Sequence, residues 1–378
     1  MDRNVMKKVC HISSVHKLND IRILHKQCAS LAEAGYDVTL VACELPEKIS
    51  YPGIRLVGLN TKGSRLSRML FRSLKAYRIA RSLRADIYHF HDPELLPYGL
   101  LLKKTTNAAV VYDSHECYPE DFLTKEWLPA WFRKIASWGI RFLENAVVRR
   151  IDFVIAATSH ITERFRPVTV RVATINNYPL REEFLDVSDD HNEEAKDGFC
   201  YVGAISEVRG ILPLMDALDS IAPSVRFYLA GTFADQKIES KVKNHRNWHR
   251  VTFLGQVSRK EIADIYRRSF AGVVNFLPAP NHNFSQPNKL FEYMSAGIPT
   301  ICSNFYLWEN IVKKGCCGVC VNPSSSKELA AAINQLSEDM KLRIQFSKNA
   351  IRLTQALYCW DFEAENLLRV YGDILYEA

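Results

Sequence analysis

The segment 284–303 places a lysine and a glutamate at the start of a predicted helix, a combination that can bind both an anion and a diol. Pro287 suits a first helical position because its φ is fixed and it has no N–H group to leave unpaired. Free N–H groups near 288–290 favour an anion in front of the helix, and Lys289 adds a positive charge. The Glu292 carboxylate, one turn further on, can accept two hydroxyl hydrogen bonds. The spacing fits a nucleotide sugar; the alternative is an amphipathic helix with a surface Lys–Glu pair.

The residues after Glu292 predict how this helix is built and where it ends. Its middle carries an apolar face that can pack on a sheet. Gly297 suits the end of a helix, Pro299 prevents its continuation, and residues 300–302 read as a short buried strand. The polar residues are therefore expected at a loop–helix junction of an α/β unit.

Apolar strand patterns alternate with helical patterns along the whole chain, which predicts an α/β fold with parallel sheets. Asp20 suits the N-cap of the first helix, which is expected to run to Ala34 and to be closed by Gly35. The predicted strands are 7–14, 37–43, 54–59, 86–91, 108–112, 153–157, 170–175, 198–202, 225–230, 251–254, 271–275, 300–302 and 318–321.

Length and composition favour a soluble protein of two domains. The chain has 378 residues, of which 47% are hydrophobic and 24% charged, with a net charge of +7. No apolar run approaches the roughly 20 residues of a membrane span, and no signal peptide precedes the first strand, so a cytoplasmic location is expected. Cys317 and Cys320 have metal-ligand spacing but lack a second ligand pair, so no metal site is expected.

Polar residues follow the first predicted strand, where a parallel sheet binds its ligands. His16, Asp20 and Arg22 lie at this possible site. The alternative is that Asp20 only caps its helix and that Arg22 pairs with it. The loop has no G-x-G-x-x-G pattern, which makes an NAD enzyme improbable.

Two clusters of histidine and acid follow two further strands. His91 and Asp92 end the strand at 86–91, and His115 stands just after the strand at 108–112. Each histidine alone could instead be a core or capping residue.

The second half offers a possible phosphate-binding loop after its first strand. Gly203 allows a backbone to approach a phosphate closely, and the Arg209 guanidinium can bind one with two hydrogen bonds. The alternative is an ordinary surface loop with an arginine at a helix entry.

Two helices have compositions that suit a membrane surface. Residues 65–84 carry seven basic and no acidic side chains. These like charges repel one another, and an anionic partner would reduce that repulsion. Residues 127–150 place tryptophans beside lysine and arginine, as an interfacial helix does. Packing of these tryptophans in the core is the alternative. No nucleic-acid reader motif is present in either.

The segment Pro-Asn-Lys-Leu-Phe-Glu-Tyr-Met-Ser-Ala-Gly-Ile-Pro at 287–299 resembles the donor-binding segment of glycosyltransferase family 4, the retaining GT-B enzymes. The motifs His-Phe-His-Asp-Pro and Tyr-Asp-Ser-His-Glu resemble that family too, and the likeness extends over nearly the whole chain. Of the family's two glutamates, Glu292 matches the second, which binds the ribose. The first falls on Phe284, which is not a carboxylate.

The resemblance implies the roles of individual residues. His115 would face the donor sugar beside the reacting centre, and Arg209 would match the second of two basic residues on the diphosphate, the first falling near Ala204. The implied catalytic residues are His115, Arg209 and Lys289. The implied donor-binding residues are Gly203, Arg209, Gly255, Val257, Asn288, Lys289, Leu290 and Glu292. The acceptor-side candidates are His16, Asp20, Arg22, His91 and Asp92.

The resemblance also implies the architecture: GT-B, two Rossmann-like domains facing a cleft. The expected divisions are an acceptor domain at 1–180, a linker at 181–197, a nucleotide-sugar domain at 198–355, and a terminal helix at 356–378 that returns to the first domain.

The implied activity is metal-independent, retaining hexosyl transfer from a UDP- or GDP-linked sugar, without a cofactor. The expected acceptor is a lipid-linked glycan at the inner face of the cytoplasmic membrane, contacted through Arg65–Arg84 and Trp127–Arg150. Two alternatives remain: a sugar-nucleotide 2-epimerase of the same fold, and a non-catalytic binder of carbohydrate or a membrane surface.

Overall fold

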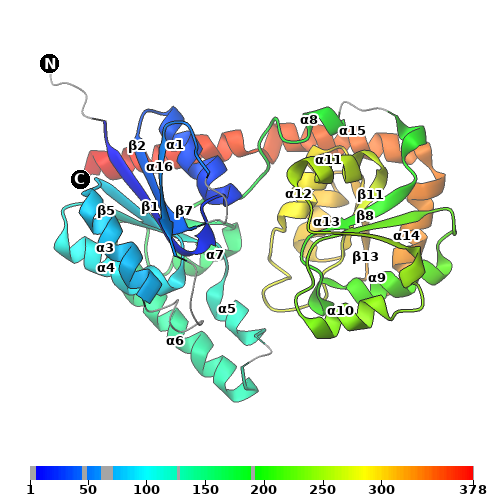
Figure 1. The fold of residues 1–378 in the computed structure, drawn as a ribbon, viewed down its shortest axis with the longest axis horizontal. Coiled ribbons are helices and arrows are strands. Elements are labelled where there is room, and N and C mark those ends of the chain that lie inside the picture. The colour runs from blue at the N-terminus through cyan, green and yellow to red at the C-terminus, as the bar shows by residue number, and fades with distance from the viewer. Residues whose placement is uncertain (1–5, 45–48, 61–70, 126–127, 189–191, 378) are drawn as a thin grey trace. The chain divides into compact units, whose positions relative to one another are not determined.

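The computed structural model describes residues 6–44, 49–60, 71–125, 128–188 and 192–377. The chain divides into two compact units, drawn in Figure 1. The first unit comprises Met1–Asn177 together with Trp360–Ala378, and the second comprises Tyr178–Cys359.

The first unit is built on a parallel sheet of seven strands in the order β3-β2-β1-β4-β5-β6-β7. The strands are β1 Lys8–Lys17, β2 Asp37–Cys43, β3 Ile54–Leu59, β4 Ile87–Phe90, β5 Ala109–Ser114, β6 Phe153–Ala156 and β7 Val172–Thr174. The helices are η1 Ile21–Cys28, α1 Ala29–Glu33, α3 Ser73–Leu83, η3 Pro93–Leu95, α4 Leu96–Thr105, α5 Tyr118–Leu123, α6 Ala130–Val148, α7 Ser159–Phe165 and α16 Trp360–Glu377.

Helices cover both faces of this sheet, so the side chains of its central strands are buried, including the polar His89 and Asp113. Figure 1 shows α1 and α16 on one side of the strands and α3 and α4 on the other. Every residue of β4 and of β5 is buried, as expected for parallel strands packed on two sides. The Asp20 side chain accepts a hydrogen bond from Ile23 N and so caps η1, which is wound as a π-helix.

The second unit repeats the plan with six parallel strands in the order β10-β9-β8-β11-β12-β13. The strands are β8 Gly198–Val202, β9 Arg226–Ala230, β10 Val251–Gly255, β11 Ser269–Val274, β12 Thr300–Ser303 and β13 Gly318–Val321. The helices are α8 Leu185–Ser188, η4 Glu193–Ala195, η5 Glu207–Arg209, α9 Ile211–Ala217, η6 Leu218–Ser220, α10 Gln236–Lys243, η7 Trp248–Arg250, α11 Arg259–Arg267, α12 Asn288–Ser295, α13 Tyr306–Val312, α14 Ser326–Glu338 and α15 Met340–Leu357.

Two apolar cores lie on the two faces of the second sheet. One contains side chains of α11, α12 and α13, and the other contains side chains of α9, α10 and α14. Phe184 and Val187, which fall in the predicted linker, are buried in the first of these cores. This segment is therefore part of the second unit rather than a polar connection.

The predicted α/β fold and the thirteen predicted strands are confirmed, with ends that shift by a few residues. Pro287 is the N-cap of α12 rather than its first helical residue, because its ψ of 130° is extended. Among the described residues, no helix is both long and apolar enough to cross a membrane.

Candidate active site

Both predicted phosphate-binding cations of the second unit flank the loop after β8. An atom placed where a Cβ would stand on Gly203 lies 3.8 Å from Arg209 Nη1 and 3.9 Å from Lys289 Cε. These two residues are 80 positions apart in the sequence, and the sheet brings them to one backbone turn. Because Gly203 has a φ of +148° and no side chain, the space between the two cations stays open.

Three neighbouring strands of this sheet have a glycine at the same edge: Gly203 and Gly231 directly follow β8 and β9, and Gly255 is the last residue of β10. Gly231 N donates a hydrogen bond of 2.7 Å to Gly255 O, and a Cβ on Gly231 would stand 1.7 Å from Gly203 O. No side chain fits at Gly231, so the ends of β8 and β9 are held in backbone contact. Gly255 ends β10, and the half-buried Val257 lies on the loop that follows, where the resemblance expects a nucleotide base.

The arginine of this loop is held by residues that sequence reasoning missed. The Arg209 guanidinium lies 5.2 Å from the centre of the Phe276 ring, and Leu277 N donates to Val208 O at 2.9 Å. Asn275 Nδ2 donates to Gly210 O, the residue after Arg209, at 3.1 Å. The signal that could have identified Asn275 and Phe276 is their position directly after β11, at the carboxyl end of the strand.

Glu292 is buried and interacts with two cations. Its Oε2 accepts from Lys289 Nζ at 2.7 Å and from Tyr266 Oη at 3.3 Å, and it lies 3.3 Å from Arg259 Nη1. Arg259 also pairs with Glu183. Lys289 therefore connects the carboxylate to the Gly203 loop, and Arg259 is a second cation that no local motif indicated.

The first turn of α12 meets the expectation of free amides only in part, because Leu290 N donates to Pro287 O at 3.0 Å. Among the described residues, no side chain caps this helix. Asn288 is exposed, whereas Leu290 is buried and anchors the helix in the core. Phe284, at the position of the family's first glutamate, has 51% of its surface exposed.

In the first unit, Asp92 binds the C-terminal half of β1 instead of facing solvent. It is 2% exposed, and its Oδ2 accepts from Ser14 N at 2.6 Å and from Ser13 Oγ at 2.8 Å. Direct contact of Asp92 with an acceptor is thus corrected to a structural role. His16 and Asp20 remain partly exposed beside it and bind each other at 3.1 Å.

Arg22 is also corrected, and so is its predicted pairing with Asp20. Its guanidinium is buried and forms two hydrogen bonds with the Asp113 carboxylate, Nε to Oδ2 at 3.0 Å and Nη2 to Oδ1 at 2.8 Å. Gln27 Nε2 donates to the same Oδ2 at 2.7 Å. The charge of Arg22 holds the pKa of Asp113 well below its usual range, although burial opposes this effect.

His115 lies next to the buried pair of Arg22 and Asp113 and is more exposed than His91. Its Nε2 lies 3.1 Å from Asp113 Oδ2 and 3.2 Å from His91 Nδ1. His91 is fully buried, so the predicted contact of His91 with an acceptor is corrected. The His16 ring lies 5.0 Å from the His115 ring, which groups His16, Asp20 and His115 at the carboxyl edge of this sheet.

The spacing of His91, Asp113 and His115 could in principle hold a metal ion, since their three atoms are 3.1–3.3 Å apart. Asp113 Oδ2, however, already accepts from Arg22 and Gln27, and a second cation beside the buried guanidinium is unfavourable. The donor set therefore suits hydrogen bonding better than metal binding.

The stability of the first unit is expected to be greatest near pH 6.5. Burial lowers the pKa of His11 and His89 well below normal and that of His91 to about 3, so the unfolded chain binds more protons below pH 6.5 and stability falls with acid. Burial opposes the charge of His16, but the Asp20 hydrogen bond and the charges of Asp92 and Asp20 raise its pKa to about 9. That contribution is lost as the pH rises from 6.5 through 9.

Urea unfolding between pH 5 and 9 measures this dependence, and each buried histidine should steepen the acid side by up to about 1 kcal/mol per pH unit. His249→Gln, an exposed histidine of the second unit, is the control that should leave the profile unchanged. A free energy of unfolding that stays constant between pH 5 and 7 would contradict the lowered pKa values of the buried histidines.

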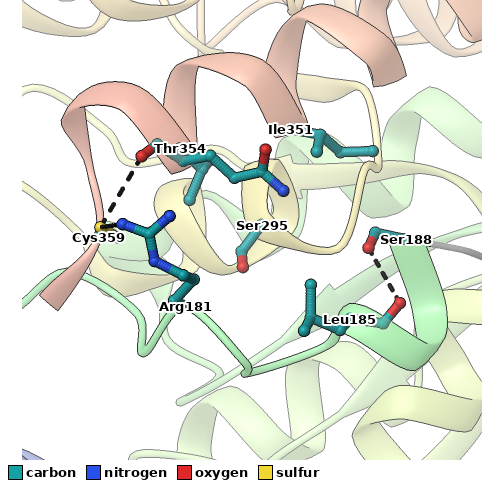
Figure 2. Close-up of a pocket in the computed structure, with 8 residues that line it drawn as sticks. Arg181, Leu185, Ser188, Ser295, Ile351, Thr354 and Cys359 are labelled. Carbon is teal, nitrogen blue, oxygen red and sulfur yellow. Dashed lines mark hydrogen bonds between the residues drawn. The ribbon is translucent and has the colours of Figure 1, made fainter. Parts of the chain in front are cut away.

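A small pocket of the second unit lies apart from the predicted donor residues. Figure 2 shows its lining, in which Arg181 reaches Cys359 Sγ at 3.7 Å and Ser295 stands at the last turn of α12. The lining residues are Arg181, Leu185, Ser188, Ser295, Ile351, Thr354, Gln355 and Cys359. Ser295 is the last residue of α12, whereas Lys289 lies in the first turn of that helix. This pocket is therefore not the proposed donor site.

Two family models match successive parts of the chain. Residues 22–177 match Glycosyltransferase Family 4, and residues 186–353 match Glycosyl transferases group 1. The chain therefore belongs to the group 1/family 4 glycosyltransferases, as its motifs predicted.

The similar proteins agree with this assignment and show the fold. Spore coat protein SA of Bacillus subtilis is 28% identical over 184 residues, 45% of this chain and 47% of that protein, so the match spans about half of that relative. Sucrose-phosphate synthase from Thermosynechococcus elongatus aligns with a TM-score of 0.79 at 20% identity, over 98% of this chain and 100% of that chain. Anabaena HepE in complex with UDP-glucose aligns with a TM-score of 0.73 at 16% identity, over 97% and 99%. The fold is that of the GT-B glycosyltransferases.

Proposed function

We propose that this protein transfers a sugar, with retention of anomeric configuration, from a UDP- or GDP-linked donor to a hydroxyl of a lipid-linked glycan. The observation that carries the proposal is the placement of Arg209 and Lys289 around the open turn at Gly203. A guanidinium, an ammonium and an uncapped helix start together form a site for a diphosphate. The similar HepE protein, whose structure is a complex with UDP-glucose, supports a nucleotide-sugar donor.

The proposed reaction is a front-face substitution that needs no metal. The bond from the anomeric carbon to the β-phosphate oxygen breaks, and the acceptor oxygen bonds to the same face of that carbon. The acceptor proton passes to the departing phosphate oxygen. Arg209, Lys289 and the α12 amides stabilise the charge that develops on the diphosphate, and His115 contacts the donor sugar.

Lys289 and Glu292 have linked roles in this scheme. In the free protein the Lys289 ammonium is bound to Glu292, at 2.7 Å. When a donor binds, the ammonium turns to the diphosphate and Glu292 accepts from the ribose hydroxyls. Arg259 and Tyr266 stay beside the carboxylate and keep it compensated.

A panel of UDP-, GDP- and dTDP-sugars, assayed for slow hydrolysis, tests the enzymatic assignment and identifies the base. Release of one nucleotide, reduced by Lys289→Ala, is the expected result. The second candidate, a non-catalytic binder, is favoured by Phe284 in place of a glutamate. That candidate predicts nucleotide binding without release of nucleotide from any donor.

The surface of α6 supports an acceptor at a membrane. Trp131, Ile135, Trp138 and Phe142 recur along one stripe and are 69%, 55%, 69% and 66% exposed. Only the C-terminal end of this helix contributes buried side chains, so the alternative of tryptophans in the core is wrong. The exposed Lys134 and Arg141 flank the stripe, a pattern typical of an interfacial helix.

The basic helix contributes less to this surface than its composition suggests. Arg65 and Arg68 lie outside the described residues, and so does Trp127. Arg72 is buried, and its Nη1 donates to Ser14 O at 3.0 Å, so it is removed from the proposed membrane contact. Four exposed basic residues of this segment remain available: Lys75, Arg78, Arg81 and Arg84.

The double variant Trp131→Ser/Trp138→Ser is expected to lose most co-sedimentation with vesicles of mixed neutral and anionic lipid. Loss of two interfacial indoles removes apolar area that only a lipid surface covers. Tyr306→Ser, an 82% exposed aromatic residue of the second unit, is the matched control that should bind normally. If both variants bind the vesicles equally well, the proposed contact of α6 with a membrane is contradicted.

A further inference from the structure

A buried chain of ring nitrogens connects His115 to the C-terminal helix. His115 Nε2 lies 3.2 Å from His91 Nδ1, and His91 Nε2 lies 3.0 Å from His11 Nδ1. His11 Nε2 lies 3.3 Å from the hydroxyl of Tyr371 on α16, which lies 2.7 Å from His89 Nδ1. His11, His89, His91 and Tyr371 are all fully buried, and every member belongs to the first unit.

The three fully buried imidazoles, His11, His89 and His91, are neutral, so each has one N–H donor and one acceptor nitrogen. Burial lowers the pKa of His91 to about 3 and those of His11 and His89 well below their usual value. A chain of neutral imidazoles has a direction, because the donor of one ring must meet the acceptor of the next. Choosing the tautomer of one ring therefore fixes the others.

The surroundings of Asp113 select one of the two directions. Its Oδ2 accepts from Arg22 and Gln27 and lies 3.1 Å from His115 Nε2, so a proton on that nitrogen would be a third donor. An N–H on His91 Nδ1, 3.3 Å from the same oxygen, would be a fourth donor and would face the His115 N–H. The favoured arrangement therefore leaves His91 Nδ1 as an acceptor and puts the proton of His91 on Nε2.

The remaining protons follow from this choice. His91 Nε2 donates to His11 Nδ1, His11 Nε2 donates to the Tyr371 oxygen, and the Tyr371 hydroxyl donates to His89 Nδ1. The proton of His89 is then on Nε2, which has no hydrogen-bond partner among the described residues and lies 4.0 Å from Asp113 Oδ2. An N–H group on His89 Nε2 that faces the Asp113 carboxylate is electrostatically favourable, whereas a lone pair on that nitrogen would be repelled by it.

We propose that Tyr371 is a positioning residue whose hydroxyl orders His11 and His91 and so holds the proton of His115 on Nε2. His115 then has an acceptor lone pair on Nδ1 for a sugar hydroxyl. The role of His115 toward the sugar rests on the proposed function, but the order of the chain does not.

Removing the Tyr371 hydroxyl reverses the chain. In Tyr371→Phe the N–H of His11 Nε2 would lose its acceptor, and a buried N–H without a partner is the costlier defect. His11 therefore moves its proton to Nδ1, His91 then accepts on Nε2 and carries its proton on Nδ1, and that N–H competes with His115. The His115 proton is expected to move to Nδ1 in response.

Nitrogen NMR of ¹⁵N-histidine-labelled full-length protein reads each tautomer directly. In the unmodified protein, His11, His91 and His115 are expected to be protonated on Nε2; a His91 protonated on Nδ1 would overturn the proposal without any variant. In Tyr371→Phe all three should change tautomer. Tyr36→Phe, whose ring lies 5.8 Å from that of Tyr371, is the matched control that should change none.

Kinetics provide the second readout. Tyr371→Phe is expected to lower kcat about 10–100-fold with an unchanged donor KM, as loss of a hydrogen-bond partner behind an active histidine does.

The outcomes separate this inference from the proposed function. If the unmodified protein transfers no sugar but shows the expected tautomers, the function fails and the ordered chain stands. If transfer occurs and Tyr371→Phe leaves tautomers and kcat unchanged, the inference fails alone. A stoichiometric metal ion in the purified protein, bound to these nitrogens, would also overturn it.

Discussion

Arg209→Ala is expected to lower the turnover number for sugar transfer about 10²–10³-fold, because a preorganised charge on the leaving group typically contributes about 2.7–4 kcal/mol to the barrier. The guanidinium is fixed beside Gly203 and over the Phe276 ring, so it costs little to orient during the reaction. The donor KM should change less than kcat, because the charge on the diphosphate grows as the sugar leaves. Steady-state kinetics with the donor identified by the hydrolysis panel measure both quantities.

Lys241→Ala is the control for this experiment. Lys241 is exposed and pairs with Glu207, two residues before Arg209, so its removal perturbs the same loop without touching the proposed phosphate site. The turnover number of this control is expected to stay within about a factor of two of that of the unmodified enzyme. Equal losses in both variants would mean that Arg209 acts only through the folding of the loop.

Arg22→Ala is expected to destabilise the first unit by about 3–5 kcal/mol, since it leaves the buried Asp113 carboxylate without its cation. Arg22 and Asp113 are 5% and 0% exposed in their side chains, and the substitution also removes the hydrogen bond from Arg22 Nη1 to Ile175 O. Urea unfolding followed by circular dichroism measures the change.

Arg166→Ala removes an arginine whose ion pair with Glu163 is about two-thirds exposed on both sides. This control is expected to leave stability nearly unchanged, because solvent screens such pairs. A similar small effect for Arg22→Ala would show that the buried pair is not a main stabilising contact. The expected difference between the two variants is therefore the informative quantity.

The sequence allowed prediction of the fold because its local signals agree with one another. Strands such as β5 and β11 are mostly apolar and buried at every residue, because both faces of each sheet are covered. The caps were readable as well: Asp20 begins the first helical segment, and Gly297 ends α12 with a φ of +68°.

The residues of the proposed donor site could be grouped from the sequence for a related reason. Lys289 and Glu292 are close in the sequence, and Gly203 and Arg209 stand at a strand end, where a parallel sheet binds its ligands. Arg259 was not predictable, because its contact with Glu292 comes from the packing of α11 against α12.

Burial of charged side chains could not be read from local patterns. Arg22 meets Asp113 across 91 positions, and the same tertiary packing that buries this pair also removed Arg22 from the acceptor site. Arg72 looked like one of a solvated basic run but reaches the end of β1. The Tyr371–His11 contact joins residues 360 positions apart, so no motif could have indicated it.

The most direct test of the proposed function is a crystal structure of the protein soaked with UDP or GDP. The diphosphate is expected in front of the first turn of α12, within hydrogen-bond distance of Arg209 and Lys289. The ribose hydroxyls are expected to bind Glu292. A nucleotide bound at any other place on the second unit, with Lys289 still bound to Glu292, would contradict it.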